Sequence, residues 1–442
     1  MASCGGCRLF VLTVRTLLGG PAWTRPAVTQ SVSQTRTVVT STKTCSLEPL
    51  SQVQRKSPST TGKGERTSPS SGHTQRNLSA VAVALKGQYR PHSRYELLEL
   101  GDVVDNTRKA LACKTLRRFI VEPALARLVT EHLASDIEHG KAVIFECDPG
   151  PGLLTRALIN CGAQRVVTLE GDKVFLSDLQ ALERRLDGQL EVVHCDFSKL
   201  DPLRQGSMRP PAMYSEKLFA DLGISETSWG ADVPVKVVGM FSLKNERNQL
   251  LKLVYSLFER LSIYRYGRIE LIMFMTEKEF TRLVAKPGDY RAYQPVGALW
   301  QMACDIQLLH KEPLSSFVTT SKDGRIALSK SSLPDDNMCL VRLTPRKDFF
   351  TARLTPNNGG TLVMMVKQCL AKRRALLVER LDSWSPASGS KLVRQMGLFE
   401  DVLTGQLYPE EYKQLFELME KSQEFNQSWL YEEILENTKV SC

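Results

Sequence analysis

The sequence predicts an α/β fold in which a mostly parallel sheet carries helices on both faces and a small helical domain follows. Three observations predict it: an apolar strand runs into a glycine-rich turn and a helix, the next two strands each lead to an acidic residue, and the pattern becomes helical after Pro345. Because such strand–turn–helix units build doubly wound sheets, a ligand site is expected at the carboxyl edge of the strands.

The glycine-rich turn is the strongest single signal. Residues 142–145 form an apolar run that suits a strand covered on both faces, and Gly150 and Gly152 follow it closely. Apolar residues then recur at helical spacing over residues 154–161, and Gly162 is a natural helix end. Since glycines let a ligand approach the backbone, the turn predicts a nucleotide-type site.

The acids around this turn favour S-adenosylmethionine over a dinucleotide. A dinucleotide fingerprint needs a third glycine three residues after the second, and Thr155 stands there. S-adenosylmethionine has no phosphates and carries a cationic end, which suits Glu146 before the turn. Glu170 and Asp196 follow the next two expected strands, where they are predicted to hold ribose hydroxyls and the adenine amine. The alternative is that each acid is a solvated loop carboxylate.

The positive charge of the chain is concentrated at its amino end. The 442 residues carry a net charge of +10, yet residues 1–94 hold 13 Lys/Arg and 2 Asp/Glu, so the remainder sums to −1. Residues 1–47 are rich in Arg, Ser and Thr and contain no Asp or Glu, which is typical of a mitochondrial transit peptide; a secretory signal is the alternative. Residues 48–95 are predicted to be a disordered linker.

Cysteine usage and hydropathy exclude several classes of protein. Most of the 11 cysteines stand singly in apolar segments, which predicts buried reduced thiols. Cys4 and Cys7 form one CxxC without a second pair, so no zinc site is expected. No stretch approaches the roughly 18 uninterrupted apolar residues of a membrane span.

The order of the motifs resembles one enzyme family. Over residues 114–345 the chain resembles the ribosomal RNA adenine N6,N6-dimethyltransferases, and within them the mitochondrial transcription factor B branch. The matching blocks are the glycine turn with Glu170 and Asp196, and the segments 279–288, 313–317 and 341–345. The resemblance implies a class I S-adenosylmethionine-dependent methyltransferase domain, Rossmann-like with a seven-stranded mostly parallel sheet, over residues 96–345. It also implies a helical domain over 346–442 that binds nucleic acid or a partner and ends in an acidic tail.

Two departures from the family concern the site itself. The family opens with Gln-Asn-Phe-Leu, and here Arg117-Arg118-Phe119-Ile120 takes that place. The resemblance implies that Ile120 keeps an apolar contact near the cofactor while the polar contacts change. The family's catalytic turn, Asn-Leu-Pro-Tyr, is replaced by Gly239-Met240-Phe241-Ser242.

The second departure removes groups that the chemistry needs. An exocyclic adenine amine is a poor nucleophile, and the family's Asn and Pro carbonyls accept its hydrogens and orient its lone pair. Gly239 offers no side chain, so we assign no catalytic residue. Phe241 is a candidate for stacking an unpaired base, and core packing is the alternative.

The branch that the chain resembles implies a mitochondrial transcription initiation factor. Such a factor joins mitochondrial RNA polymerase and the mitochondrial HMG-box factor in the matrix nucleoid and helps to open promoter DNA, holding single-stranded nucleic acid. The first alternative is an active dimethyltransferase that modifies two adenines of mitochondrial small-subunit rRNA. The second is an RNA-holding factor without catalysis.

The carboxyl-terminal part divides into a basic and an acidic stretch. Residues 341–380 hold nine Lys/Arg against two acids, and the cluster Lys372-Arg373-Arg374 predicts contact with nucleic-acid phosphates; a solvated helix face is the alternative. Residues 398–442 hold ten acids and three Lys. They predict a helix from Pro409 and another over 429–435, which either contact a partner or pack on their own domain.

Overall fold

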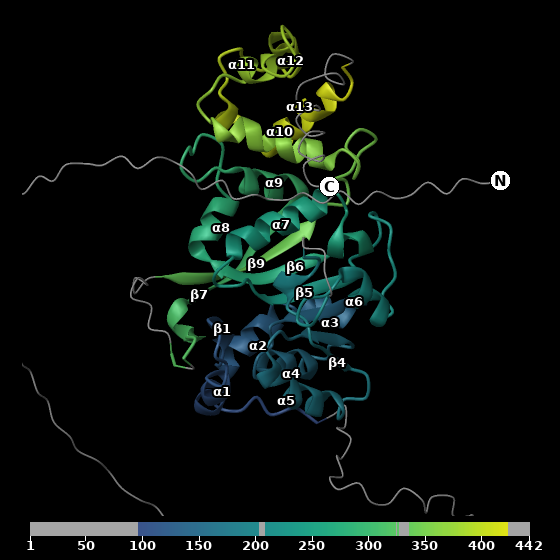
Figure 1. Cartoon of the computed structure of the whole chain (residues 1–442), viewed down its shortest axis with the longest axis vertical. Coiled ribbons are helices and arrows are strands. Elements are labelled where there is room, and N and C mark those ends of the chain that lie inside the picture. Colours follow the sequence, from purple (N-terminus) through teal and green to yellow (C-terminus); the bar gives the residue numbers. More distant parts are fainter. Residues whose placement is uncertain (1–95, 203–207, 324, 327–335, 423–442) are drawn as a thin grey trace, which may run out of the picture. The chain divides into compact units, whose positions relative to one another are not determined.

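The computed structural model describes residues 96–202, 208–323, 325–326 and 336–422, all within one compact unit (Figure 1). The predicted transit peptide, the predicted linker and the helix predicted over 429–435 therefore lie outside the described residues. They stay predictions.

The central sheet has the strand order β4-β3-β2-β5-β6-β9-β7. β9 runs antiparallel to β6 and β7, and the pairs from β4 to β6 are parallel, which confirms the mostly parallel seven-stranded sheet. The order reverses at β2, between β3 and β5, where a doubly wound sheet offers its ligand crevice. The strands are β2 (Val143–Cys147), β3 (Val166–Leu169), β4 (Leu190–Val193), β5 (Val235–Met240), β6 (Glu270–Thr276), β7 (Cys304–Pro313) and β9 (Asn337–Pro345).

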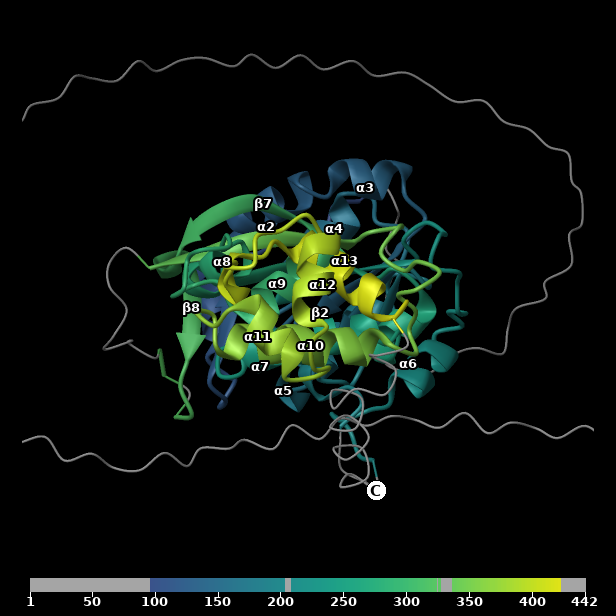
Figure 2. The same ribbon diagram turned by 90° about the horizontal axis from the view of Figure 1, so that it is seen from above.

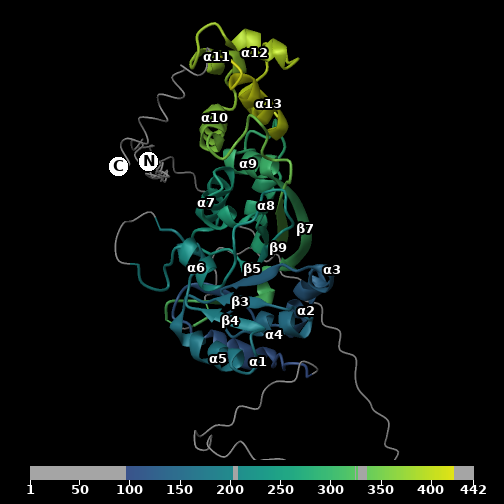
Figure 3. The same cartoon turned by 90° about the vertical axis from the view of Figure 1, so that its right-hand side faces the viewer.

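Helices cover both faces of this sheet, and alternating strand residues show how (Figure 3). On one face, Ile144 of β2 and Val238 of β5 join a buried cluster with residues of α2, α3 and α4. On the other face, their strand neighbours Phe145 and Val237 join a second cluster with residues of α6, α7 and α9. These helices and their neighbours are α2 (Pro123–Glu131), α3 (Ala134–His139), α4 (Leu153–Asn160), α5 (Lys173–Glu183), α6 (Ser215–Asp221), α7 (Glu246–Phe258), α8 (Glu277–Leu283) and α9 (Pro295–Ala303). Short 3₁₀ turns lie at Phe197–Lys199, Ser262–Tyr266, Leu314–Ser316 and Thr404–Gln406.

A small two-stranded sheet lies outside the main one. β1 (Arg117–Ile120) pairs antiparallel with β8 (Phe317–Thr320), and α1 (Val103–Ala110) precedes it. Because β1 pairs with β8 and not with a strand of the central sheet, its side chains are brought to the glycine turn by packing rather than by that sheet's hydrogen bonds.

The carboxyl-terminal helices share the core of the α/β part. They are α10 (Gly359–Ala371), α11 (Leu377–Asp382), α12 (Gly389–Gln395) and α13 (Pro409–Met419), and α10 and α13 lie against α9 (Figure 2). Leu362 and Phe416 belong to the same buried cluster as Phe145 of β2. One buried cluster therefore contains residues from both sides of the predicted boundary at 345/346. The helix predicted from Pro409 is confirmed, and its apolar face packs on its own domain.

Over the described residues, no helix is long and apolar enough to cross a membrane, and no group of His, Cys, Asp or Glu is placed to hold a metal. The described cysteines are free thiols, and all of them except Cys161 are buried, as predicted.

Candidate cofactor and nucleic-acid site

The fold brings the three predicted acids to one edge of the sheet. Glu146 is the penultimate residue of β2, Glu170 follows β3 directly, and Asp196 lies three residues beyond β4. Gly171 keeps the last two close together, because a Cβ atom at Gly171 would lie 3.0 Å from the Cβ of Asp196. The structure thus brings together the three acids that the sequence singled out, and their contacts with the cofactor stay predictions.

The turn between β2 and α4 has the conformation that its glycines allow. Gly150 and Gly152 have φ values of 57° and 75°, in the left-handed region. The N–H of Gly150 donates to Glu170 Oε2 over 2.9 Å, so the turn is tied to the end of β3. A Cβ at Gly150 would lie 2.6 Å from the ring of Phe119, which packs directly on the turn.

Glu146 is a buried carboxyl with one partner. It accepts a hydrogen bond of 2.6 Å from the Thr155 hydroxyl, the residue that stands where a dinucleotide site needs glycine. Burial raises the pKa of Glu146 to about 8, against the smaller opposing effect of the Thr155 hydrogen bond. Burial also raises the pKa of Asp148 to about 6, although Arg117 acts to lower it.

We expect Glu146→Gln to reduce the loss of stability at alkaline pH. The ordinary pKa of 4.5 applies to the unfolded chain and about 8 to the folded one, so the folded state holds the proton more tightly. Stability from this group is complete below pH 4.5 and is lost as the pH rises through 8, at about 1.4 kcal/mol per pKa unit. Urea unfolding at pH 5 and pH 9 would measure it. Equal losses in both proteins would contradict the assignment.

Arg117 is the site residue that sequence reasoning missed. Its guanidinium forms a bidentate pair with Glu170, with Nη1 2.7 Å from Oε1 and Nη2 2.8 Å from Oε2. The side chain of Glu170 is fully buried and that of Arg117 is 12% exposed. The sequence pointed to this position only through the replacement of the family's Gln by Arg117. Ile120, the predicted apolar contact, is buried in the core cluster that holds Ile144.

Asp196 is held by its own loop. It accepts from the N–H and hydroxyl of Ser198 and forms an ion pair of 2.6 Å with Lys199. Burial acts to raise its pKa, but these hydrogen bonds and the Lys199 charge hold that pKa below its usual value.

The segment that replaces the catalytic turn is partly strand and partly core. Gly239 and Met240 are the last residues of β5, and Gly239 is paired with Cys147 at a φ of 150°. A Cβ at Gly239 would lie 2.6 Å from the carbonyl oxygen of Cys147. Phe241 lies in the main core cluster with only 5% of its surface exposed. This agrees with the core-packing alternative, and its ring presents no face to a base. The N–H of Ser242 donates to the side chain of Gln249.

We expect Gly239→Ala to lower the free energy of unfolding by about 1–3 kcal/mol, because the side chain meets backbone and the φ value favours glycine. Gly230→Ala is the matched control, since Gly230 has open space around its Cβ and no positive φ. Its effect should stay within about 0.5 kcal/mol. Urea unfolding would compare the two, and equal effects would show that close strand packing is not the cause.

The three basic residues predicted to bind nucleic acid have different roles. Arg373 donates to the backbone carbonyls of Tyr290 and Leu370 and is therefore engaged within the domain. Lys372 and Arg374 are exposed, and the guanidinium of Arg374 lies 5.1 Å from the ring centroid of Tyr290. The exposed part of the cluster is thus Lys372 and Arg374, beside the half-buried Tyr290.

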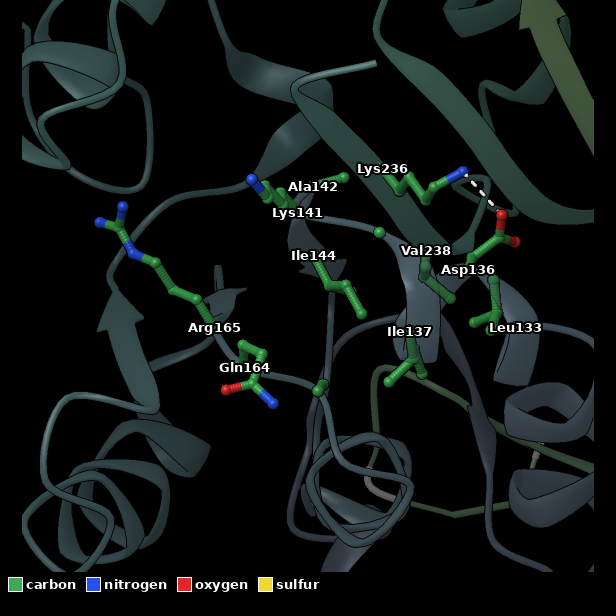
Figure 4. Close-up of a pocket in the computed structure, with 12 residues that line it drawn as sticks. Leu133, Asp136, Ile137, Lys141, Ala142, Ile144, Gln164, Arg165, Lys236 and Val238 are labelled. Carbon is green, nitrogen blue, oxygen red and sulfur yellow. Dashed lines mark hydrogen bonds and ion pairs between the residues drawn. The ribbon is translucent and has the colours of Figure 1, made fainter. Parts of the chain in front are cut away.

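A cavity of about 50 Å³ lies away from this site, near the amino ends of β2 and β5 (Figure 4). It is lined mainly by apolar side chains, with Asp136, Arg165 and Lys236 at its border. Its volume is far below the roughly 300–1,000 Å³ of small-molecule sites, so we assign it no ligand.

Comparisons with known proteins agree with this geometry. A family model described as ribosomal RNA adenine dimethylase matches residues 117–421. The chain belongs to the ribosomal RNA adenine dimethylase family. A human protein named dimethyladenosine transferase 2, mitochondrial is 40% identical over 73% of this chain and 82% of its own length. The mouse protein of the same name is 41% identical over 73% and 80%. A crystal structure of a dimethyladenosine transferase from Plasmodium falciparum superposes with a TM-score of 0.46 at 14% identity, covering 68% of this chain and 95% of that one.

Membership of the dimethylase family fixes the cofactor as S-adenosylmethionine. When bound, this cofactor supplies an electrophilic methyl group. The residue types of the turn suit such a ligand, because Gly150 and Gly152 carry no side chains of their own and three acids end beside it, while the ring of Phe119 lies on Gly150 in this structure. The glycine turn and the acids expected of a dimethylase are thus present, and the chain departs from the family's residues at Arg117 and at the end of β5.

Proposed function

We propose that the protein is a mitochondrial transcription initiation factor that joins mitochondrial RNA polymerase and the HMG-box factor and assists promoter melting. It does so on an S-adenosylmethionine-binding dimethyltransferase scaffold that retains at most weak methyl transfer. The observation that carries the proposal is the end of β5, where the groups that position an adenine amine are missing.

The chemistry of the amine makes this loss decisive. A side chain at Gly239 would meet the backbone of Cys147, so an amide cannot stand there without moving β2. Met240 offers only a thioether, which is a weak acceptor, and Phe241 is buried. Losing one positioned group of this kind costs about 10²–10⁴ in rate. A protein that keeps the frame without these groups is suited to binding nucleic acid rather than to modifying it.

Two further observations support the proposal. Lys372 and Arg374 give an exposed basic surface beside Tyr290, and such a surface holds a nucleic-acid backbone and an unpaired base. The human and mouse relatives are named mitochondrial, which agrees with the transit peptide predicted at residues 1–47. We propose that the protein acts in the mitochondrial matrix, at the nucleoid.

A second candidate function rests on the retained cofactor frame. The glycine turn persists together with Glu170 and Asp196, to which the family resemblance assigns the ribose and the adenine. An active rRNA adenine dimethyltransferase of the mitochondrial small subunit would use this frame. It would need an acceptor for the adenine amine from outside residues 239–241.

Run-off transcription tests the proposal. The full chain, mitochondrial RNA polymerase and the HMG-box factor would be assayed on a duplex promoter and on the same promoter melted beforehand. We expect transcripts from the duplex to require the protein and transcripts from the melted template to form largely without it. If the protein changes neither template, the initiation function is wrong and the rRNA functions remain.

We expect the double variant Lys372→Ala, Arg374→Ala to bind single-stranded DNA more weakly and with a lower salt dependence. Each lost phosphate contact reduces the slope of log K against log salt by about 0.7. The measurement is fluorescence anisotropy over a salt series. Arg127→Ala, an exposed arginine of α2, is the control and should leave the slope unchanged. An unchanged slope in the double variant would show that nucleic acid binds at another surface of the protein.

A further inference from the structure

The carboxylate of Glu170 has every acceptor position filled. Oε1 accepts from Arg117 Nη1 and from the N–H of Asp172, at 2.7 Å each. Oε2 accepts from Arg117 Nη2 at 2.8 Å and from the N–H of Gly150 at 2.9 Å. An ionised carboxylate offers about four lone-pair sites, and all four are occupied by the protein itself. A ribose diol that approaches Glu170 finds no acceptor left.

Of these four donors, only the two on Arg117 belong to a side chain. The N–H groups of Gly150 and Asp172 are fixed by the turn and by the end of β3. Arg117 comes from β1, which is paired with β8 outside the central sheet. Its guanidinium can therefore leave Glu170 without breaking a strand pair of the central sheet.

Aromatic packing holds the guanidinium in place. Its carbon lies 4.8 Å from the ring centroid of Phe119 and 5.4 Å from that of Phe175. These two rings meet edge to face at 5.6 Å. Such cation–π contacts strengthen when they are desolvated, as they are here. Phe119 also covers Gly150, so one strand blocks both the ribose acceptor and the turn beside it.

Charge adds to the obstruction. Arg117 Nη2 lies 3.8 Å from Asp148 Oδ1, so the guanidinium stands between two carboxylates of the site. A ligand that displaces it must supply donors to Glu170 and leave the buried Arg117 a new partner. The Nε of Arg117 already lacks one in its buried position. Separating Arg117 from Glu170 therefore costs free energy, because the buried guanidinium loses its carboxylate partner.

We propose that Arg117 is an internal competitor of S-adenosylmethionine for Glu170. While the pair is closed the ribose hydroxyls cannot bind, and the apparent affinity for the cofactor is the intrinsic affinity multiplied by the small fraction of molecules in which the pair is open. This inference rests on the cofactor of the family and is independent of any role in transcription. It assigns to Arg117 the control of cofactor access.

Calorimetric titration of the full chain with S-adenosylmethionine tests it. Arg117→Gln restores the residue type that the family has here and keeps a polar side chain beside Glu170. We expect it to bind the cofactor about 10–100-fold more tightly than the wild type, the factor set by one strong charge-assisted pair. Arg117→Lys keeps the charge but loses the bidentate geometry, and should fall between them. Arg127→Gln is the control and should bind as the wild type does.

Nucleoside titrations show whether the gain arises at the ribose. Adenosine should bind Arg117→Gln more tightly than wild type, and 2′-deoxyadenosine should lose most of that gain, because it lacks one hydroxyl for Glu170. A folded Arg117→Gln that binds S-adenosylmethionine no more tightly than the wild type, or not at all, overturns the proposal. So does an equal gain for both nucleosides. If circular dichroism shows Arg117→Gln to be unfolded, the same comparisons decide with Arg117→Lys.

Discussion

Glu270→Gln is expected to lower the free energy of unfolding by about 3–5 kcal/mol, the cost of breaking a buried ion pair. Glu270 Oε1 lies 2.5 Å from Lys236 Nζ and 3.7 Å from Arg342 Nη1, and Oε2 accepts from the Thr344 hydroxyl at 2.6 Å. Removing its charge leaves two largely buried cations, Lys236 and Arg342, with Asp136 as their remaining carboxylate. Figure 4 shows the Lys236–Asp136 pair. The network joins β5, β6 and β9 to α3, so the loss affects the middle of the sheet.

Two control variants show whether the loss of stability comes from the burial of the charges or from breaking any ion pair. Lys217→Ala breaks the pair with Asp221, whose side chains are 64% and 56% exposed, and should cost less than about 1 kcal/mol. The double variant Lys236→Met, Glu270→Leu removes both charges and should recover much of the loss, because Asp136 and Arg342 still pair. Urea unfolding measures all three. A cost below about 1 kcal/mol for Glu270→Gln would show that water reaches the network.

Trp300→Ala should lower the free energy of unfolding by about 3–5 kcal/mol, the usual cost of emptying a fully buried aromatic site. Trp300 lies in α9, which contacts α7 as well as α10 and α13, and its indole N–H donates to the carbonyl of Leu250. Because one core cluster spans the α/β part and the carboxyl-terminal helices, both should unfold in one transition.

Calorimetry of Trp300→Ala would show whether that transition stays single. Phe399→Ala is the control, since Phe399 is 85% exposed and its removal should change stability by no more than about 0.5 kcal/mol. Two separate transitions in the wild type would contradict a shared core and restore a domain boundary near residue 345.

Much of the sheet and its ligand edge could be predicted because the signals are local. An apolar run, a glycine turn and an acid within a few residues define β2, and the same reasoning placed Glu170 at the end of β3. The strand expected just before Asp196 is β4, which ends at Val193, and the chain then turns toward the 3₁₀ segment at Phe197–Lys199. Local pattern thus located the acids correctly.

What the sequence could not show depends on distant partners. Arg117 and Glu170 are 53 residues apart, and nothing in either segment indicates that they meet. Phe241 was equally suited to a base or to the core, and only the fold shows that it lies in the main core cluster. Arg373 was grouped with its neighbours by charge, but its contact with the Tyr290 carbonyl needs the fold.

We propose that this scaffold acts by binding nucleic acid and not by methyl transfer. The most direct measurement is run-off transcription from a duplex promoter with the full chain, mitochondrial RNA polymerase and the HMG-box factor, first without S-adenosylmethionine and then with it. We predict promoter-dependent transcripts without the cofactor and the same yield after it is added. Transcripts that form only when S-adenosylmethionine is present would contradict the account.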